Sequence, residues 1–191
     1  MRTAKAQATR DRLLDVATRL FADRGYEGTS IEGVLAEAGV SRGALYHHFP
    51  SKEALFEAVY SAAQARVAQE VIEGAAGASN PVEMIRAGTR AWLDRVRDPI
   101  VRQITLIDAP AVLGWRRWRE IDEEHFLGTI KLAMQEAGGS DASPTRVELL
   151  AHMYLGMVVE VAMMIARGDR SDESVAEAAA EVDSLIARMF D

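Results

Sequence analysis

Cysteine is absent from the 191-residue sequence, so neither a disulfide framework nor a thiolate metal site is possible. No apolar run approaches the roughly 18 residues that a membrane-spanning helix needs. The basic start, residues 1–12, is not followed by an apolar core and a cleavage site, which argues against a secretory signal. These absences favour a cytoplasmic protein that has no membrane partner.

Hydrophobic residues make up 49% of the chain and charged residues 27%, which is enough for a sizeable core in one domain or two small ones. The net charge of −7 would usually argue against a nucleic-acid partner. Residues 1–56 are nevertheless close to neutral, with eight basic and seven acidic side chains, so the acidity lies downstream. The first third of the chain is therefore permissive for DNA binding.

Strand signals are also missing, because no pair of alternating segments joined by a hairpin turn is found. Apolar residues instead recur at spacings of three and four, as on one face of a helix. Breaking and capping residues divide the chain into helices over about 5–24, 30–38, 42–48, 51–73, 81 onward, 115–137, 144–168 and 172 onward. Pro99 and Pro110 predict short helices that meet at angles in the middle, and Thr29 with Glu32 fits a capping box. The sequence predicts an all-α fold of about nine helices.

Residues 39–55, GVSRGALYHHFPSKEAL, have the pattern of a helix-turn-helix. Gly39 permits the tight turn between two short helices, and Leu45 is expected to hold the second helix against the first. In this motif the N-terminal residues of the second helix read base edges in the major groove, while residues around it hold phosphates. The stretch therefore predicts a DNA-reading surface.

The outward residue types suit this role. Arg42 matches guanine O6 and N7, and Ala44 matches a thymine methyl group. Gly43 and Ala44 are small, so the backbone can approach the groove closely. Tyr46 and His47 are of the type that donates to phosphate. Lys52 falls in the first turn of the next helix, where its charge and the helix amides both favour an anion.

The stretch resembles the N-terminal domain of the tetracycline-repressor (TetR) family of bacterial regulators. The residues that carry the resemblance are Leu20-Phe21, Gly25-Tyr26, Thr29-Ser30-Ile31, Ala38 to Phe49, and Ser51-Lys52. Leu35 departs from the family, which usually has alanine there. The resemblance implies a helix-turn-helix DNA-binding domain over residues 1–56 and an effector-binding and dimerisation domain over residues 57–191. By position, it implies phosphate contacts from Thr29, Ser30, Tyr46, His47 and Lys52, and major-groove contacts from Ser41, Arg42, Gly43 and Ala44.

The adjacent histidines do not favour a metal site, because neighbouring residues on a helix point about 100° apart and cannot easily ligate one ion. His47 is interpreted as a phosphate contact. His48 precedes Phe49, which continues the core, and is expected to be a partly buried packing residue.

The last two helices carry apolar residues on more than one side. Between residues 144 and 168, one side has Val147, Ala151, Tyr154, Val158, Val161 and Ile165, and the other has Leu150, Met153, Met157 and Met164. The last helix repeats apolar residues at Val175, Ala178, Val182, Leu185 and Met189. Two such helices from each of two chains would form a four-helix bundle, although an intramolecular core would use the same stripes. The family resemblance implies a homodimer through these helices.

Large apolar side chains in the middle of the chain are candidates to contact a small-molecule effector. They are Trp92, Ile104, Ile107, Trp115, Trp118, Phe126, Tyr154 and Met157. Aromatic and methionine side chains suit a concave, largely apolar site, but the same spacing is typical of ordinary core. Glu160 stands alone in an apolar stretch and is expected to be buried, paired across the dimer or in contact with an effector.

Catalysis is not predicted, and no cofactor or metal is required. The alternative is a metal-dependent enzyme on a helical bundle, because Asp122 with His125 and Glu148 with His152 have helical spacing. Neither pair has the Glu-x-x-His form typical of such sites. The prediction is a regulator that a small molecule releases from a pseudo-palindromic, double-stranded DNA operator.

Overall fold

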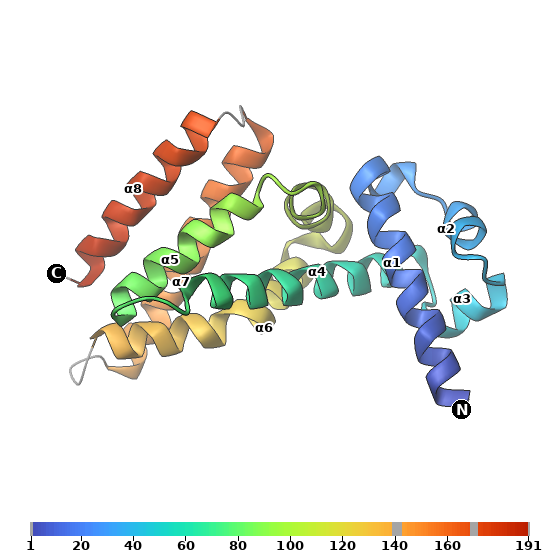
Figure 1. The fold of residues 1–191 in the computed structure, drawn as a ribbon, viewed down its shortest axis with the longest axis horizontal. Coiled ribbons are helices and arrows are strands. Elements are labelled where there is room, and N and C mark those ends of the chain that lie inside the picture. Colours follow the sequence, from blue (N-terminus) through green and yellow to red (C-terminus); the bar gives the residue numbers. More distant parts are fainter. Residues whose placement is uncertain (1, 139–142, 169–171, 191) are drawn as a thin grey trace. The chain divides into compact units, whose positions relative to one another are not determined.

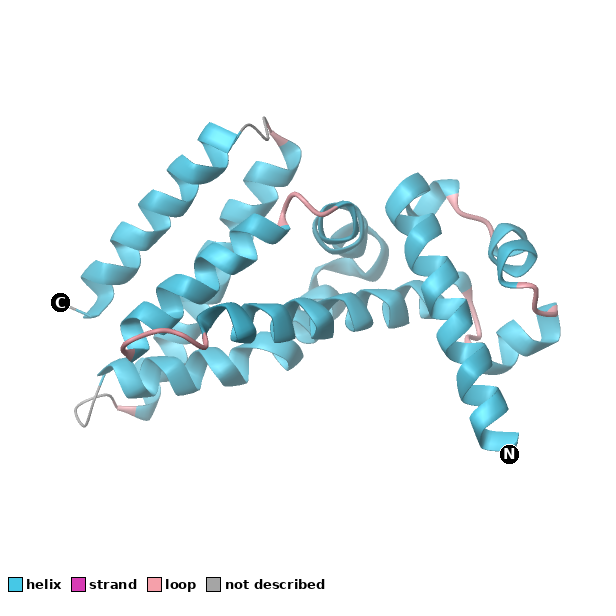
Figure 2. Cartoon of the chain, in the orientation of Figure 1, coloured by secondary structure: helices cyan, strands magenta, loops and turns pink. Residues whose placement is uncertain are grey.

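Helices account for all the regular structure in the described part of the chain, as the ribbon of the computed structural model shows (Figures 1 and 2). The structure describes residues 2–138, 143–168 and 172–190. In these ranges the order of elements is α1 (Arg2–Gly28), α2 (Ile31–Ala38), α3 (Arg42–His48), α4 (Lys52–Ala75), α5 (Pro81–Arg95), the π-helix η1 (Ile100–Asp108), α6 (Ala109–Gly138), α7 (Pro144–Arg167) and α8 (Asp172–Phe190). The predicted all-α fold class is confirmed.

Two glycines end helices where the sequence predicts. Gly25 interrupts α1 with a φ of 69°, and Gly39 closes α2 with a φ of 63°. The Gly39 N–H donates to the Leu35 carbonyl oxygen at 2.9 Å. Both φ values lie in the left-handed region, where a residue with a Cβ is strained. These breaks let α2 and α3 pack back against α1.

The capping box predicted at Thr29 is wrong. Ser30 is the N-cap of α2, and its Oγ accepts from the Gly33 N–H at 3.1 Å. The Thr29 side chain is buried, and its hydroxyl donates to the carbonyl oxygens of Leu20 and Gly25 at 3.0 and 2.9 Å. Thr29 therefore fixes the turn between α1 and α2 and lies one residue before the actual cap, Ser30.

The chain forms two compact units. Unit 1 comprises Met1–Ala63 and Asp98–Trp118, and unit 2 comprises Gln64–Arg97 and Arg119–Asp191. Unit 1 includes η1 because this segment packs against α1. The functional boundary after residue 56 stays a prediction, since compactness alone does not assign function.

Aromatic residues and one carboxylate hold unit 1 together. The Phe56 ring lies 5.1 Å, between centroids, from both Phe21 and Tyr26. Asp108, the last residue of η1, accepts the Tyr26 backbone N–H at 2.8 Å and the Gln103 amide at 3.1 Å. The Tyr26 N–H, which follows the Gly25 break, is therefore hydrogen-bonded by a residue from the second segment of unit 1.

The proline-interrupted middle differs from the expected short helices. Pro99 precedes a single π-helix, η1, and Pro110 lies in the first turn of α6, where its missing N–H costs little. Within α6, Gly114 breaks the helix with a φ of 73°. The helix predicted from Trp115 therefore corresponds to the part of α6 that follows this break.

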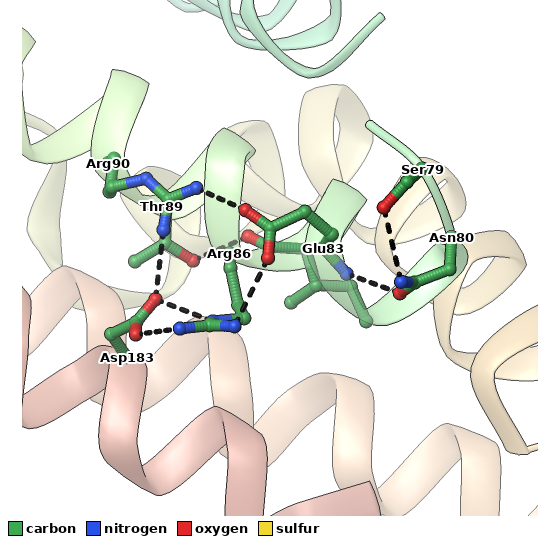
Figure 3. A network of polar contacts seen from close by, with 8 residues as sticks. Ser79, Asn80, Glu83, Arg86, Thr89, Arg90 and Asp183 are labelled. Atoms are coloured by element: carbon green, nitrogen blue, oxygen red, sulfur yellow. Dashed lines mark hydrogen bonds and ion pairs between the residues drawn. The ribbon is translucent and has the colours of Figure 1, made fainter. Parts of the chain in front are cut away.

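A polar network ties α8 to α5 in unit 2 (Figure 3). Arg86 donates to both carboxylate oxygens of Asp183, with Nε 2.8 Å from Oδ1, and Arg90 reaches the same Oδ1 at 3.0 Å. Glu83, held at the start of α5 by the Asn80 cap, accepts from both arginines. The Arg86 guanidinium lowers the pKa of Asp183 from its ordinary value. The network fixes α8 beside α5 from the first turns of α5.

α7 is an apolar core helix of unit 2. By length and composition it could also cross a membrane, which the lack of an uninterrupted apolar run did not predict. Half of the 18-residue apolar window of this helix is buried inside the structure, and buried core helices meet the same criteria.

Candidate DNA-binding interface and unit 2 cavity

The helix α3 is presented by a cap at one end and an anchor in its middle. Ser41 caps it, because the Ser41 Oγ accepts from the Ala44 N–H at 3.3 Å. Leu45 is fully buried, as is Val34 of α2. These contacts fix the rotation of α3 and so determine which residues face outward.

The outward face of α3 has the predicted composition. Arg42, Gly43, Tyr46 and His47 are exposed, and Ala44 is half-buried. A Cβ added at Gly43 would meet nothing within 4 Å. The glycine therefore leaves open space at the surface, as a backbone that approaches another molecule closely requires.

Arg42 is held by two neighbours in the free protein. Its Nη1 lies 2.9 Å from Glu32 Oε1, and its guanidinium carbon lies 5.6 Å from the centroid of the Tyr46 ring. A backbone hydrogen bond at Glu32 and the contact with Arg42 lower the pKa of the Glu32 carboxyl. Because Arg42 and Glu32 are both exposed, this ion pair is weak and can exchange for another acceptor.

Lys52 is positioned by an aromatic ring. Its Nζ lies 4.0 Å from the centroid of Tyr26, a cation–π contact. Ser51 caps the helix that Lys52 begins, accepting the Ala54 N–H at 3.0 Å. A positive charge thus lies beside the N-terminus of α4, where an anion is favoured.

Two arginines of α1 were missed by the sequence analysis. The Arg10 guanidinium carbon lies 5.4 Å from the centroid of Phe49. Arg12 Nη2 lies 3.5 Å from where a Cβ on Gly39 would be, and so beside the turn between α2 and α3. The signal was present, since both residues belong to the basic start of the chain, but their proximity to the turn depends on the tertiary fold.

His48, predicted to pack, and Thr29, predicted to contact phosphate, are both at least partly withdrawn from solvent. His48 is half-buried and its ring lies 6.3 Å from Phe49, as expected for a packing residue. Thr29 is buried with its hydroxyl already donated. Its neighbour Ser30 is exposed at the N-terminus of α2 and is the better placed of the two to meet a phosphate.

Unit 2 contains two adjoining cavities, which we call together the unit 2 cavity. One measures about 60 Å³ and the other about 210 Å³, and they share Val71, Gly88, Ile130 and Tyr154. Residues of α4, α5, α6 and α7 form the walls. Trp92, Phe126 and Tyr154, three predicted effector contacts, line it.

Four other predicted effector contacts belong to unit 1 instead. Ile104 and Trp118 are buried there, Ile107 is half-buried, and Trp115 is 65% exposed. The Trp118 indole N–H donates to the Thr105 carbonyl oxygen at 3.1 Å. Met157 is in unit 2 but does not line either cavity. The structure instead adds Val71, Asp122, Ile130, Leu155, Val158 and Val159 to the wall.

The four residues of the metal-enzyme alternative are not assembled into a metal site. Glu148 and His152 hydrogen-bond each other at 2.9 Å on an exposed face. Asp122 is buried and accepts from the Gln64 amide at 2.9 Å. Within the described residues, no group of three potential ligands is arranged to hold a metal ion.

Exposed apolar side chains form a stripe on α7 and continue on α8. Leu149, Met153 and Met164 of α7 are 59%, 59% and 67% exposed, and Leu185 of α8 is 45% exposed. Glu160 lies at the same helical spacing and is exposed in a single chain, so its pairing across a dimer stays a prediction. Exposed apolar side chains that recur along one helix face are typical of a protein–protein interface.

Comparisons with known proteins agree with this architecture. Residues 13–59 match the family model for bacterial regulatory proteins of the tetR family, and residues 82–189 match the model for the tetracyclin repressor-like C-terminal domain. The HTH-type transcriptional repressor AcnR of Corynebacterium efficiens is 29% identical over 185 residues, covering 94% of this chain and 93% of its own. AcrR of Shigella flexneri is 39% identical over 69 residues, which is 36% of this chain and 32% of its own.

Solved structures extend the similarity to the whole fold. A TetR-family transcriptional regulator from Pectobacterium atrosepticum is 30% identical, has a TM-score of 0.79, and is covered over 94% of its length by 95% of this chain. The fatty acid degradation regulator FadR of Bacillus halodurans has a TM-score of 0.72 at 17% identity, covering 93% of this chain and 94% of its own, and shares the fold. The two matched family models and the regulator from Pectobacterium atrosepticum show that the chain belongs to the tetracycline-repressor family of DNA-binding transcriptional regulators.

Proposed function

We propose that this regulator is a cytoplasmic homodimeric repressor, released from a pseudo-palindromic operator when a small, largely apolar effector occupies the unit 2 cavity. The observation that carries the proposal is the outward face of α3, capped at Ser41, anchored by Leu45 and open at Gly43. The full-length similarity to AcnR, which is named a repressor, supports repression over activation.

The proposed groove contacts are Ser41, Arg42, Gly43 and Ala44 at the N-terminal end of α3. The proposed phosphate contacts are Ser30, Tyr46, His47 and Lys52, joined by Arg12 beside the Gly39 turn. Thr29 is left out, because its hydroxyl is donated within unit 1. Arg42 reaches a base edge by exchanging its Glu32 partner for guanine.

Dimerisation is proposed through the apolar stripe of α7 and α8. A two-fold dimer covers the same surface on both chains and presents two copies of α3 to two half-sites. Glu160, exposed in one chain, falls within that interface. The stripe explains why α7 is apolar on the side that unit 2 does not bury.

The effector acts by preferring one of two shapes. The helix α4 begins at Lys52 in unit 1 and ends at Ala75 in unit 2, where Val71 lines the cavity. A ligand that binds better to the shape in which the two recognition helices no longer match their half-sites lowers operator occupancy by its differential affinity.

Selection of genomic fragments by the purified protein tests the proposal. The expected result is a small set of fragments with inverted repeats upstream of genes, each bound with strong salt dependence. A reporter placed behind such a fragment should be silenced by the protein. Reporter activation, or no fragment enriched over bulk DNA, would refute the proposed function.

A further inference from the structure

The wall of the unit 2 cavity carries one acidic side chain. The smaller cavity is lined by ten residues, and among them only Asp122 carries a formal charge. Asp122 is 3% exposed. A carboxylate in an apolar wall is costly unless it is paired, so its partners decide what the cavity can accept.

The partners of Asp122 compensate its negative charge only in part. Asp122 Oδ1 accepts a hydrogen bond at 2.9 Å from the Gln64 side-chain amide, which carries no charge. Oδ2 lies 3.4 Å from Arg119 Nη1, and the Arg119 Nε lies 3.2 Å from Glu123 Oε1. One guanidinium therefore serves two carboxylates. From α7, His152 Nδ1 lies 3.6 Å from the same Glu123 oxygen and turns its charge, when protonated, toward Glu123.

Desolvation dominates over this partial pairing. Burial raises the pKa of Asp122 to about 6, although Arg119 and the Gln64 amide oppose the shift. At neutral pH the Asp122 side chain is therefore mostly ionised, although burial removes much of the hydration that stabilises the carboxylate. A second positive charge next to it would remove that cost.

Aromatic rings stand in the same wall. Trp92 and Phe126 have ring centroids 6.0 Å apart and planes inclined at 57°, and Tyr154 lines both cavities. Aromatic faces attract organic cations. The Trp92 indole N–H is buried without a hydrogen-bond partner among the described residues, whereas the Tyr154 hydroxyl is bonded to Thr89 at 2.7 Å. Trp92 thus retains an unpaired donor on a residue that lines the cavity.

We infer that the effector of this regulator is a largely apolar organic monocation, an amine or quaternary ammonium ion, with Asp122 as its counter-ion. The two cavities together approach the lower end of small-molecule sites, about 300 Å³, so the ligand is small. An anion would meet Asp122 unfavourably, and a neutral molecule would leave the carboxylate uncompensated. The identification of this ligand as the effector rests on the proposed function, but its binding does not.

An isosteric pair of probes tests the charge alone. Phenyltrimethylammonium and tert-butylbenzene have the same shape and differ by one positive charge. Ligand-observed NMR titrations of the full-length protein at pH 7.5 should give at least tenfold tighter binding of the cation. The Asp122→Asn variant should lose most of that preference, while Glu136→Gln, which removes an exposed carboxylate from the same helix, should keep it.

Equal affinity for the two probes, binding of neither, or an unchanged preference in Asp122→Asn overturns the inference. A melting curve of each variant shows that it is folded. Operator binding is measured in parallel. If the protein binds its operator but does not prefer the cation, this inference fails and the proposed function stands. If the cation is preferred but no operator is found, the cation site stands and the proposed function fails.

Discussion

At the scale of single residues, the DNA-reading face contains its own competitor. Glu32 occupies the Arg42 guanidinium in the free protein, at 2.9 Å, and its negative charge would lie close to the phosphates of a bound duplex. In the proposed complex, this exposed pair has to break before Arg42 contacts a base. We expect the pair to lower operator affinity without affecting the fold, because neither side chain is buried.

Glu32→Gln should strengthen operator binding by roughly twofold to fivefold at low salt, because exposed pairs of this kind contribute little and are easily removed. Fluorescence anisotropy with a labelled operator measures the change. Glu37→Gln is the control, since Glu37 is also on α2 but pairs with Arg19 at 3.1 Å. Weaker binding by Glu32→Gln would mean that Glu32 positions Arg42 for the base.

The buried carboxylate predicts a stability profile with pH. Because folding raises the pKa of Asp122 from 3.8 to about 6, the folded state holds this proton more tightly, and unfolding free energy falls as pH rises through that range. The loss is about 3 kcal/mol at most. Asp122→Asn should therefore be more stable than wild type at pH 7.5 and much closer to it at pH 4.5, as measured by urea denaturation.

The neighbours of Asp122 do not confuse this comparison. Arg119, Gln64, Glu123 and His152 are present in both proteins. The difference between wild type and variant therefore reports the Asp122 carboxyl together with its interactions with these groups. A difference that does not change with pH, or a destabilised variant at pH 7.5, would show that Arg119 fully compensates Asp122.

At the scale of elements, sequence patterns located most helix ends, because glycine, proline and capping serines act locally. Gly39, Ser41 and Pro81 are examples. Local patterns failed where tertiary contacts decide. Ser30 and Thr29 are equally good caps in sequence, and the carbonyls of α1 capture Thr29. Nothing local distinguishes a π-helix from an α-helix over residues 100–108.

The candidate sites also contain a part that the sequence predicts and a part that depends on tertiary structure. The outward residues of α3 follow from helical geometry once Leu45 is placed inside. The effector contacts could not be predicted as well, because Trp92 and Trp118 have the same residue type but belong to different compact units. The sequence indicated Asp122 only as a possible metal ligand. Its place in an apolar wall depends on four helices meeting.

Gly43→Ala separates stability from DNA binding within α3. A Cβ at this position meets nothing, and alanine favours a helix over glycine by about 0.5–1 kcal/mol. The variant should melt at an equal or higher temperature and bind operator at least tenfold more weakly, because the methyl group would occupy the space needed for the groove. Gly128→Ala on α6, also open, should be stabilised without losing affinity. Unchanged operator affinity in Gly43→Ala would place the backbone of α3 away from the bases.

At the scale of the whole molecule, one chain is an incomplete reader of DNA. A single α3 covers one half-site, whereas two copies joined by a two-fold axis cover both and multiply specificity. In the proposed dimer, the exposed stripe of α7 and α8 supplies the interface, and the network of Arg86 and Asp183 holds α8 beside α5.

Met153→Glu should convert the dimer into a monomer at micromolar concentration, because the two-fold axis brings the stripe, and therefore the new charges, close to one another. Light scattering after gel filtration gives the mass, and operator affinity should fall with it. Leu132→Glu is the matched control, since Leu132 is 68% exposed on α6 and lies outside the stripe. A variant that remains dimeric would move the interface elsewhere.

The most direct test of the DNA-reading surface is operator affinity measured over a series of salt concentrations for wild type, Arg42→Ala and Lys52→Ala. Lys52→Ala should weaken binding to every duplex and reduce the slope of log affinity against log salt by about one. Arg42→Ala should relax preference at one base pair, with a cost of about 1–3 kcal/mol on the cognate sequence. Affinities, slopes and base preferences equal to those of wild type in both variants would contradict the assignment of α3 as the element that reads DNA.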